Sequence, residues 1–188
     1  YQTTEQGTFA HKILEIVDFE KINNMSDFIS QICQHKKELK QFDSQNDENI
    51  CNLIKFLYDF DNSQTISENL TNFLSPLLKI ILQIKTFLTR DSKVYKEQKF
   101  VSYIPANQVS DYDFADKIMV QGAIDLMVIN KNNVLLFDYK LSGLKKEFLL
   151  KKYKKQLDLY ALAIEKAFKK PTIKHLVNIK LGEIYETI

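Results

Sequence analysis

Two acidic residues and a lysine lie inside apolar stretches of this 188-residue chain. Asp125 ends the segment Gly122-Ala-Ile-Asp, and Asp138 and Lys140 lie two residues apart. Burying such charges is costly unless they pair with one another or bind a metal ion. Carboxylate oxygens suit Mg²⁺, and a bound cation polarises a phosphate and lowers the pKa of a bound water. The residue types therefore fit metal-assisted phosphodiester hydrolysis, with Lys140 positioning the water or balancing charge on the phosphate.

A structural interpretation of the same residues is equally compatible with their types. Asp138 and Lys140 could form a buried ion pair, and Asp125 could cap a turn. A lone Asp-x-Lys favours this interpretation, whereas the preceding Gly-x-Ile-Asp segment brings the two alternatives to roughly equal weight.

Two neighbouring strands would bring the three charges to one point. Residues 119–129 and 133–141 are rich in Val, Ile, Leu and Phe, and Lys131-Asn-Asn between them is a turn signal. Alternate side chains of an extended strand share a face, so Asp138 and Lys140 are expected to project together. Further strands are predicted before Pro105 and over residues 173–179 and 183–188, and a polar loop over residues 107–116.

Four motifs in this order resemble the nuclease domain of the RecB and AddA family, within the PD-(D/E)XK superfamily. They are Gly7-Thr-Phe-Ala-His11, Gly122-Ala-Ile-Asp125, Asp138-Tyr-Lys140 and Gln156-Leu-Asp-Leu-Tyr160. The resemblance covers residues 7–18 and 93–168, and the middle of the chain matches no motif of that family. One departure is Leu141-Ser-Gly143, because relatives usually have Thr directly after the lysine; we expect it to alter only a local contact.

The resemblance implies an α/β fold, a restriction-endonuclease-like mixed sheet flanked by helices. It implies a Mg²⁺-dependent DNA exonuclease, with Mn²⁺ as an alternative ion, in which Asp125, Asp138 and Lys140 are catalytic. The implied metal ligands are His11, Asp125, Asp138 and the carbonyl of Tyr139. Such domains lie at the C-terminus of an AddA-type helicase–nuclease, which works with a partner subunit on double-strand DNA ends in recombinational repair.

Two alternatives to this function remain. One is a stand-alone exonuclease of the same fold, and the other is a degenerate nuclease fold that binds or scaffolds DNA. The complete set of Asp125, Asp138, Lys140 and His11 argues against degeneration. The chain contains no G-x-x-x-x-G-K-[ST] segment, so ATP-driven unwinding does not belong to it.

Two further residues have competing interpretations. His11 lies in a helix predicted from Thr3 or Thr4 to about Asp18, where a lone histidine is more often a hydrogen-bonded core residue than a ligand. The family resemblance favours the ligand. Glu97 resembles a glutamate on the corresponding strand of the family, and an exposed edge charge is as good an explanation as a supporting role in the site.

A long helix is predicted over residues 146–169. Its expected inner face is Leu149, Tyr153, Leu157, Tyr160, Ile164 and Phe168. The resemblance implies that Gln156 and Tyr160 flank the active site and the DNA path. Residues 140–170 contain ten lysines against three acids, so Lys151, Lys152 and Lys155 are expected to contact phosphates, although a solvated helix face would look the same.

The composition fits a single nuclease domain over residues 1–188, with a helical insertion over residues 24–90. The first residue is Tyr1 rather than Met, which favours a fragment of a longer protein. The two cysteines, Cys33 and Cys51, are expected to be reduced, and their number excludes a four-cysteine iron–sulfur cluster. No apolar run approaches about 18 residues, so we expect a cytoplasmic protein without a membrane span.

Overall fold

The computed structural model describes residues 2–43, 47–60, 65–108 and 117–187. Within these ranges the fold is α/β, with six α-helices and one five-stranded mixed sheet, as the sequence predicts. The chain divides into two compact units. The first comprises Tyr1–Phe87, Tyr139–Gly143 and Val177–Ile184, and the second comprises Leu88–Asp138, Leu144–Leu176 and Tyr185–Ile188.

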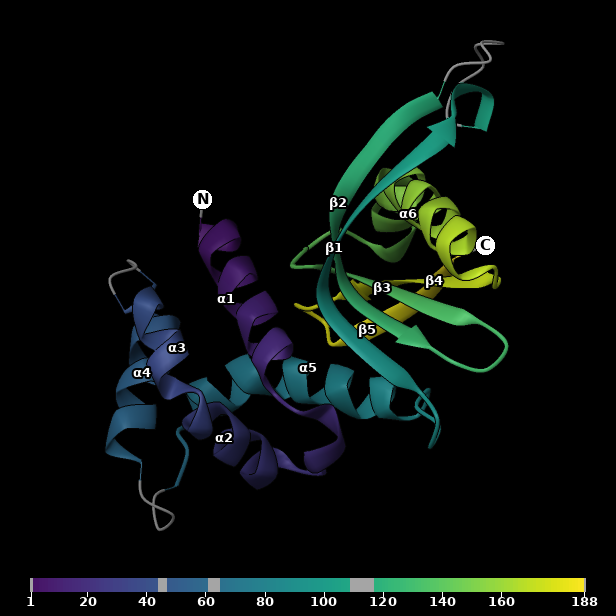
Figure 1. Cartoon of the computed structure of the whole chain (residues 1–188). Helices are drawn as coiled ribbons and strands as arrows, with labels where there is room; N and C mark the ends of the chain where they lie inside the picture. The colour runs from purple at the N-terminus through teal and green to yellow at the C-terminus, as the bar shows by residue number, and fades with distance from the viewer. Residues whose placement is uncertain (1, 44–46, 61–64, 109–116, 188) are drawn as a thin grey trace. The chain divides into compact units, whose positions relative to one another are not determined.

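The first unit is mainly helical (Figure 1). Its helices are α1 (Gln2–Ile16), α2 (Met25–Gln34), α3 (Lys36–Leu39), α4 (Glu48–Asp59) and α5 (Glu68–Lys85), with short 3₁₀ turns at Phe19–Lys21 and Lys40–Phe42. The side chains of Asn24, Asp47 and Ser67 accept backbone N–H groups at the starts of α2, α4 and α5. These caps satisfy donors that have no partner within a helix, and so they fix where each helix begins.

Apolar side chains at helical spacing form the core of this unit. On α1 the buried face is Phe9, Ile13 and Leu14, and the Phe9 ring meets Phe42 edge to face at 5.2 Å. The turn before the last strand also belongs to this unit, where Gly182 has a φ of 63° and its carbonyl accepts a 2.9 Å hydrogen bond from Gln83 of α5. No helix within the described ranges is long and apolar enough to cross a membrane.

The sheet has the order β1-β2-β3-β4-β5. Its strands are β1 (Lys93–Pro105), β2 (Lys117–Ile129), β3 (Val134–Lys140), β4 (Thr172–Asn178) and β5 (Glu183–Thr187). β1 pairs antiparallel with β2, and β2 pairs antiparallel with β3. The N–H of Val134 donates a hydrogen bond to the carbonyl of Pro171, and the N–H of Ile179 donates one to the carbonyl of Lys140. The start of β3 is thus beside the start of β4 and its end beside the end of β4, so the two strands run parallel.

The parallel pair is joined by α6 (Lys146–Phe168), the crossover that such a connection requires. Leu149, Leu157 and Ile164 of α6 are buried against the sheet, and Tyr153 and Tyr160 are partly buried. Phe168, which the helical pattern predicts on the same inner face, is instead exposed at the last turn. The predicted polar loop over residues 107–116 is described only at its start, in the 3₁₀ turn Ala106–Gln108; residues 109–116 lie outside the described residues.

Candidate active site

A row of side chains on β2 and β3 changes from apolar to acidic. Two cross-strand pairs of this row, Ile129↔Val134 and Met127↔Leu136, belong to the core beneath α6. The paired register ends at Leu126↔Phe137, and the next residues along the two strands are Asp125 and Asp138. Each strand thus carries one carboxylate directly beyond the paired segment that builds the core.

Asp138 is a buried carboxylate with a partner on a distant element. Its side chain is only 3% exposed, and its Oδ1 accepts a 3.2 Å hydrogen bond from Nε2 of Gln156 on α6. An amide N–H bonded to a carboxylate fixes the orientation of the acid. Asp138 and Gln156 come from two of the sequence motifs, and the fold brings them together.

Glu97 lies opposite Asp125 in an unusual backbone conformation. Lys96↔Leu126 and Gln98↔Ile124 are paired on either side of it, and carboxylate oxygens of Glu97 and Asp125 lie within 4.8 Å. The φ of Glu97 is 48°, in the left-handed region. Such a conformation costs a non-glycine residue about 1–3 kcal/mol and is concentrated at functional sites.

β2 also departs from a regular strand at this point. Ile124 and Met127 both contribute to the core that includes the buried face of α6, although residues three apart face opposite ways in a regular strand. The irregularity spans Asp125, opposite the strained Glu97. The sequence alone does not decide the role of Glu97, because its position depends on strand register and on a backbone conformation that no motif encodes.

Packing accounts for two further motif residues, Gly122 and Tyr160. A Cβ on Gly122 would collide with the hydroxyl group of Tyr160, and the Tyr160 ring meets Phe100 edge to face at 5.0 Å. The absence of a side chain at Gly122 therefore lets α6 lie close to β2. Since Gln156 is one helical turn before Tyr160, this close packing also helps to hold Gln156 against Asp138.

In the first unit, His11 contacts the backbone that follows Asp138. Its Nε2 lies 3.1 Å from the carbonyl oxygen of Tyr139 and donates a hydrogen bond to it, and the two rings meet edge to face at 5.5 Å. Tyr139 is buried, and Lys140 is partly buried at the end of β3. The motif residues His11, Tyr139 and Lys140 thus belong to one unit, and Asp125, Asp138, Gln156 and Tyr160 to the other.

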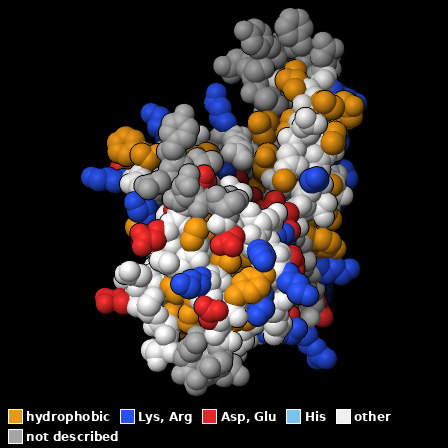
Figure 2. Space-filling view, turned by 90° about the vertical axis from the view of Figure 1, so that its left-hand side faces the viewer, with side chains coloured by type: hydrophobic (Ala, Val, Ile, Leu, Met, Phe, Trp, Pro, Cys, Tyr) orange, Lys and Arg blue, Asp and Glu red, His pale blue; other side chains and the backbone are white. Residues whose placement is uncertain are grey.

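The exposed side of α6 is strongly basic. Lys151, Lys152 and Lys155 are exposed, and within the described part of the chain they form no ion pair. Phe148, on the first turns of the same helix, is 62% exposed. By contrast, basic and acidic side chains are interspersed on the face drawn in Figure 2. The local charge of α6 suits an anionic polymer.

Comparison with known proteins gives one family and a consistent set of relatives. The model of the PD-(D/E)XK nuclease superfamily matches residues 1–186. An ATP-dependent helicase/nuclease subunit of Clostridium beijerinckii is 30% identical over 95% of this chain and 14% of the relative. The subunits of the same name from Clostridioides difficile and Oenococcus oeni are 28% and 27% identical over 86% and 96% of this chain. The chain spans only 12% and 13% of the length of these two relatives.

Proposed function

The chain belongs to the PD-(D/E)XK nuclease superfamily, and from this premise we propose that it is a metal-dependent exodeoxyribonuclease. The resemblance predicted from the four motifs is confirmed by the match over residues 1–186. The single observation that carries the proposal is the row of carboxylates. Carboxylate oxygens of Asp125 and Glu97 lie within 4.8 Å, and Asp125 on β2 and Asp138 on β3 are the residues that follow the last pair, Leu126↔Phe137.

The donor atoms fit a hard divalent cation. Two carboxylates held close together repel each other unless a proton or a cation lies between them, and oxygen ligands favour Mg²⁺, with Mn²⁺ as a substitute. The imidazole of His11 and the carbonyl oxygen of Tyr139, which lie 3.1 Å apart in the first unit, are two further groups that can donate to a divalent cation. We therefore assign His11, Asp125, Asp138 and the Tyr139 carbonyl as ligands, with Glu97 in support.

Ligation requires one change at His11. The ring nitrogen that now donates to the Tyr139 carbonyl must present its lone pair instead, so the proton moves to Nδ1. The affinity for the ion should fall as His11 becomes protonated, because imidazolium has no lone pair to offer.

The remaining residues act on the water and the phosphate. When bound, the ion lowers the pKa of a water and polarises the scissile phosphate. Lys140, two residues after Asp138, would orient that water and balance charge on the phosphate through its ammonium group. Gln156 holds the Asp138 carboxylate in a fixed orientation through its 3.2 Å hydrogen bond. Tyr160 maintains the packing of α6 on which that bond depends.

DNA is assigned to the basic side of α6. The ammonium groups of Lys151, Lys152 and Lys155 can contact phosphates, whereas this surface has no amide pattern suited to reading base edges. The relatives are named as subunits of an ATP-dependent helicase/nuclease. We propose that this chain performs the nuclease step of such a protein on DNA ends in recombinational repair, in the cytoplasm and together with a second helicase–nuclease subunit.

A cleavage assay tests the proposal. Linear single-stranded and duplex DNA are incubated with the purified protein, with Mg²⁺ or with a chelator, and an Asp138→Asn variant serves as the control. We expect shortening of the DNA from its ends only with Mg²⁺ and only with the unaltered protein. Cleavage that survives both the chelator and Asp138→Asn would reject this site as its source.

A further inference from the structure

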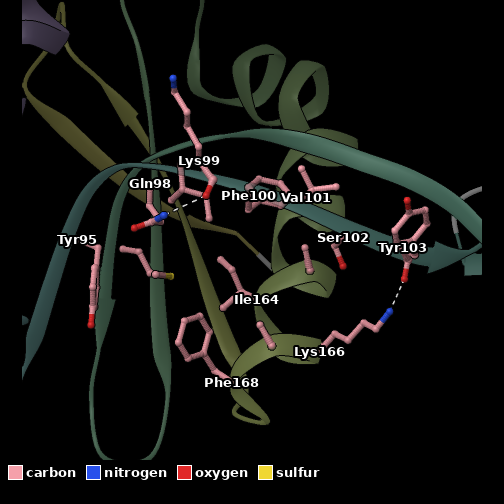
Figure 3. A pocket seen from close by; sticks show the side chains of 14 residues that line it. Tyr95, Gln98, Lys99, Phe100, Val101, Ser102, Tyr103, Ile164, Lys166 and Phe168 are labelled. Atoms are coloured by element: carbon pink, nitrogen blue, oxygen red, sulfur yellow. Dashed lines mark hydrogen bonds between the residues drawn. The ribbon is translucent and has the colours of Figure 1, made fainter.

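A groove in the second unit lies beside the acidic pair but is not part of it. It has a volume of about 620 Å³ and runs between β1 and the C-terminal end of α6 (Figure 3). Its apolar floor includes the buried side chains of Ile124, Met127, Ala163 and Ile164. A floor of this kind excludes water from whatever binds there.

Residues that line the groove flank two of the acidic residues along both strands. Tyr95 and Gln98 line it and stand on either side of Glu97, and Ile124 and Met127 stand on either side of Asp125. At about 3.3 Å per residue, these lining positions are within about 7 Å of the acids along the backbone. A ligand in the groove would therefore adjoin a phosphate at the carboxylates.

Two partly exposed aromatic rings border the groove. Tyr95 of β1 is 38% exposed and Phe168 of α6 is 39% exposed, and both rings are labelled in Figure 3. A core residue at the end of an amphipathic helix would be covered, as the sequence predicts for Phe168. Rings half open to solvent above an apolar floor are suited to stacking on a planar ligand.

The charge at the rim is positive. Lys99 and Lys166 line the groove, and no carboxylate does so among the described residues. The Nζ of Lys166 donates to the carbonyl of Tyr103, which holds that ammonium group at the rim (Figure 3). The groove therefore combines stacking surfaces with cations, the two features by which proteins bind single strands without reading their sequence.

We propose that this groove binds an unpaired base of single-stranded DNA next to the phosphodiester bond at Asp125 and Asp138. The assignment of that bond rests on the proposed function, whereas the groove itself does not. A single strand is favoured over an acidic peptide because the peptide would bring further carboxylates beside Glu97 and Asp125. A base offers a planar face to Tyr95 and Phe168, and its phosphates suit Lys99 and Lys166.

The experiment removes the aromatic ring from the protein and the base from the DNA in separate measurements. Binding of a short oligothymidylate, and of a strand of equal length with abasic sites in place of bases, is measured in chelator. Phe168→Ala should weaken binding of the oligothymidylate by about tenfold, the scale of losing one stacked base, and leave the abasic strand unaffected. Tyr95→Ala should behave in the same way. Tyr58→Ala is the matched control, since Tyr58 of α4 is 41% exposed and lies outside the groove.

The outcomes separate the groove from the nuclease assignment. Equal losses for both strands, or no loss in either groove variant, would overturn the base site even if the protein cleaves DNA with Mg²⁺. A base-dependent loss in a protein that does not cleave DNA would leave the groove in place and reject the proposed function. Thermal melting of each variant identifies any loss of folded protein.

Discussion

Two buried aspartates, one in each unit, are alike in burial and different in their partners. Asp47 is 5% exposed and Asp138 is 3% exposed. Asp47 accepts the N–H groups of Asn49 and Ile50 at 3.0 and 3.2 Å and the Gln6 amide at 2.7 Å. All three donors are neutral groups that start or brace a helix, which is the ordinary work of an N-cap.

Asp138 is placed differently. It lies within a strand rather than at a helix start, one partner of its carboxylate is an amide on a distant helix, and the next acid along the row is Asp125. Burial alone therefore does not identify a functional acid in this protein. What distinguishes Asp138 is a neighbouring carboxylate, a lysine two residues later and a supporting hydrogen bond from another motif.

The largest expected effect comes from replacing each of the two aspartates in turn. Asp138→Asn should lower DNA cleavage by more than about a hundredfold, because a ligand to the ion is lost while the side chain keeps its shape. Asp47→Ala should instead lower the free energy of unfolding by about 1–2 kcal/mol through loss of the cap, with cleavage per folded molecule unchanged. Chemical denaturation and turnover are measured on both variants. Equal behaviour of the two would show that the distinction is wrong.

Replacing Lys140 should give the second largest loss of cleavage, and it distinguishes a catalytic from a structural role of this lysine. If its ammonium acts on the water and the phosphate, Lys140→Ala lowers turnover by about a hundredfold and leaves the fold in place. If it is only an ion-pair partner, the variant loses about 3–5 kcal/mol of stability because a buried carboxylate is stranded. Melting and single-turnover cleavage are measured on one preparation. Wild-type cleavage by folded variant would exclude Lys140 from the mechanism.

The basic side of α6 should have a moderate effect that depends on salt. Replacing Lys151, Lys152, Lys154 and Lys155 with alanine should weaken DNA binding and make the dependence of log affinity on log salt shallower, because fewer counterions are released. Of these, Lys154 already faces Asp158 at 3.5 Å and should contribute least. Titrations at several salt concentrations give the slope. A slope unchanged from the wild type would locate the DNA contact elsewhere.

The smallest expected effect is on the pH dependence of stability and comes from a buried histidine of the core. His175 is buried with its ring stacked on Phe137 at 4.5 Å, and burial lowers the pKa of His175 below its ordinary value, against the opposing effect of Glu186. The unfolded chain therefore takes up a proton first as the pH falls. Stability from this group is complete above about pH 6.5 and declines below it. His175→Leu should reduce this part of the acid sensitivity in melting curves recorded from pH 7 to pH 5; identical pH dependence in variant and wild type would contradict it.

Much of the frame could be predicted from the sequence because its signals are local. The apolar runs around Asp125 and Asp138 predict β2 and β3 to within two residues, and the spacing of Leu149, Leu157 and Ile164 predicts α6. The roles of Gly122 and Tyr160 in packing could not be read in advance, because a glycine and a tyrosine far apart in sequence meet only in the folded chain.

Two residues show most clearly where prediction from sequence ends. The position of Glu97 depends on the register of β1 against β2 and on a left-handed backbone conformation, neither of which its neighbours in sequence specify. Phe168 fits the helical period of the core, yet α6 ends there and its ring borders the groove. The first depends on a tertiary pairing and the second on where the helix ends, and the local pattern encodes neither.

The central claim is that the acidic row holds the catalytic cation, and the location of bound Mn²⁺ tests it most directly. Anomalous difference density from a crystal soaked in Mn²⁺ should appear between Asp125 and Asp138 and should vanish in Asp138→Asn. Density found only at other surface carboxylates, with none at this row in a crystal that binds Mn²⁺ elsewhere, would contradict the claim.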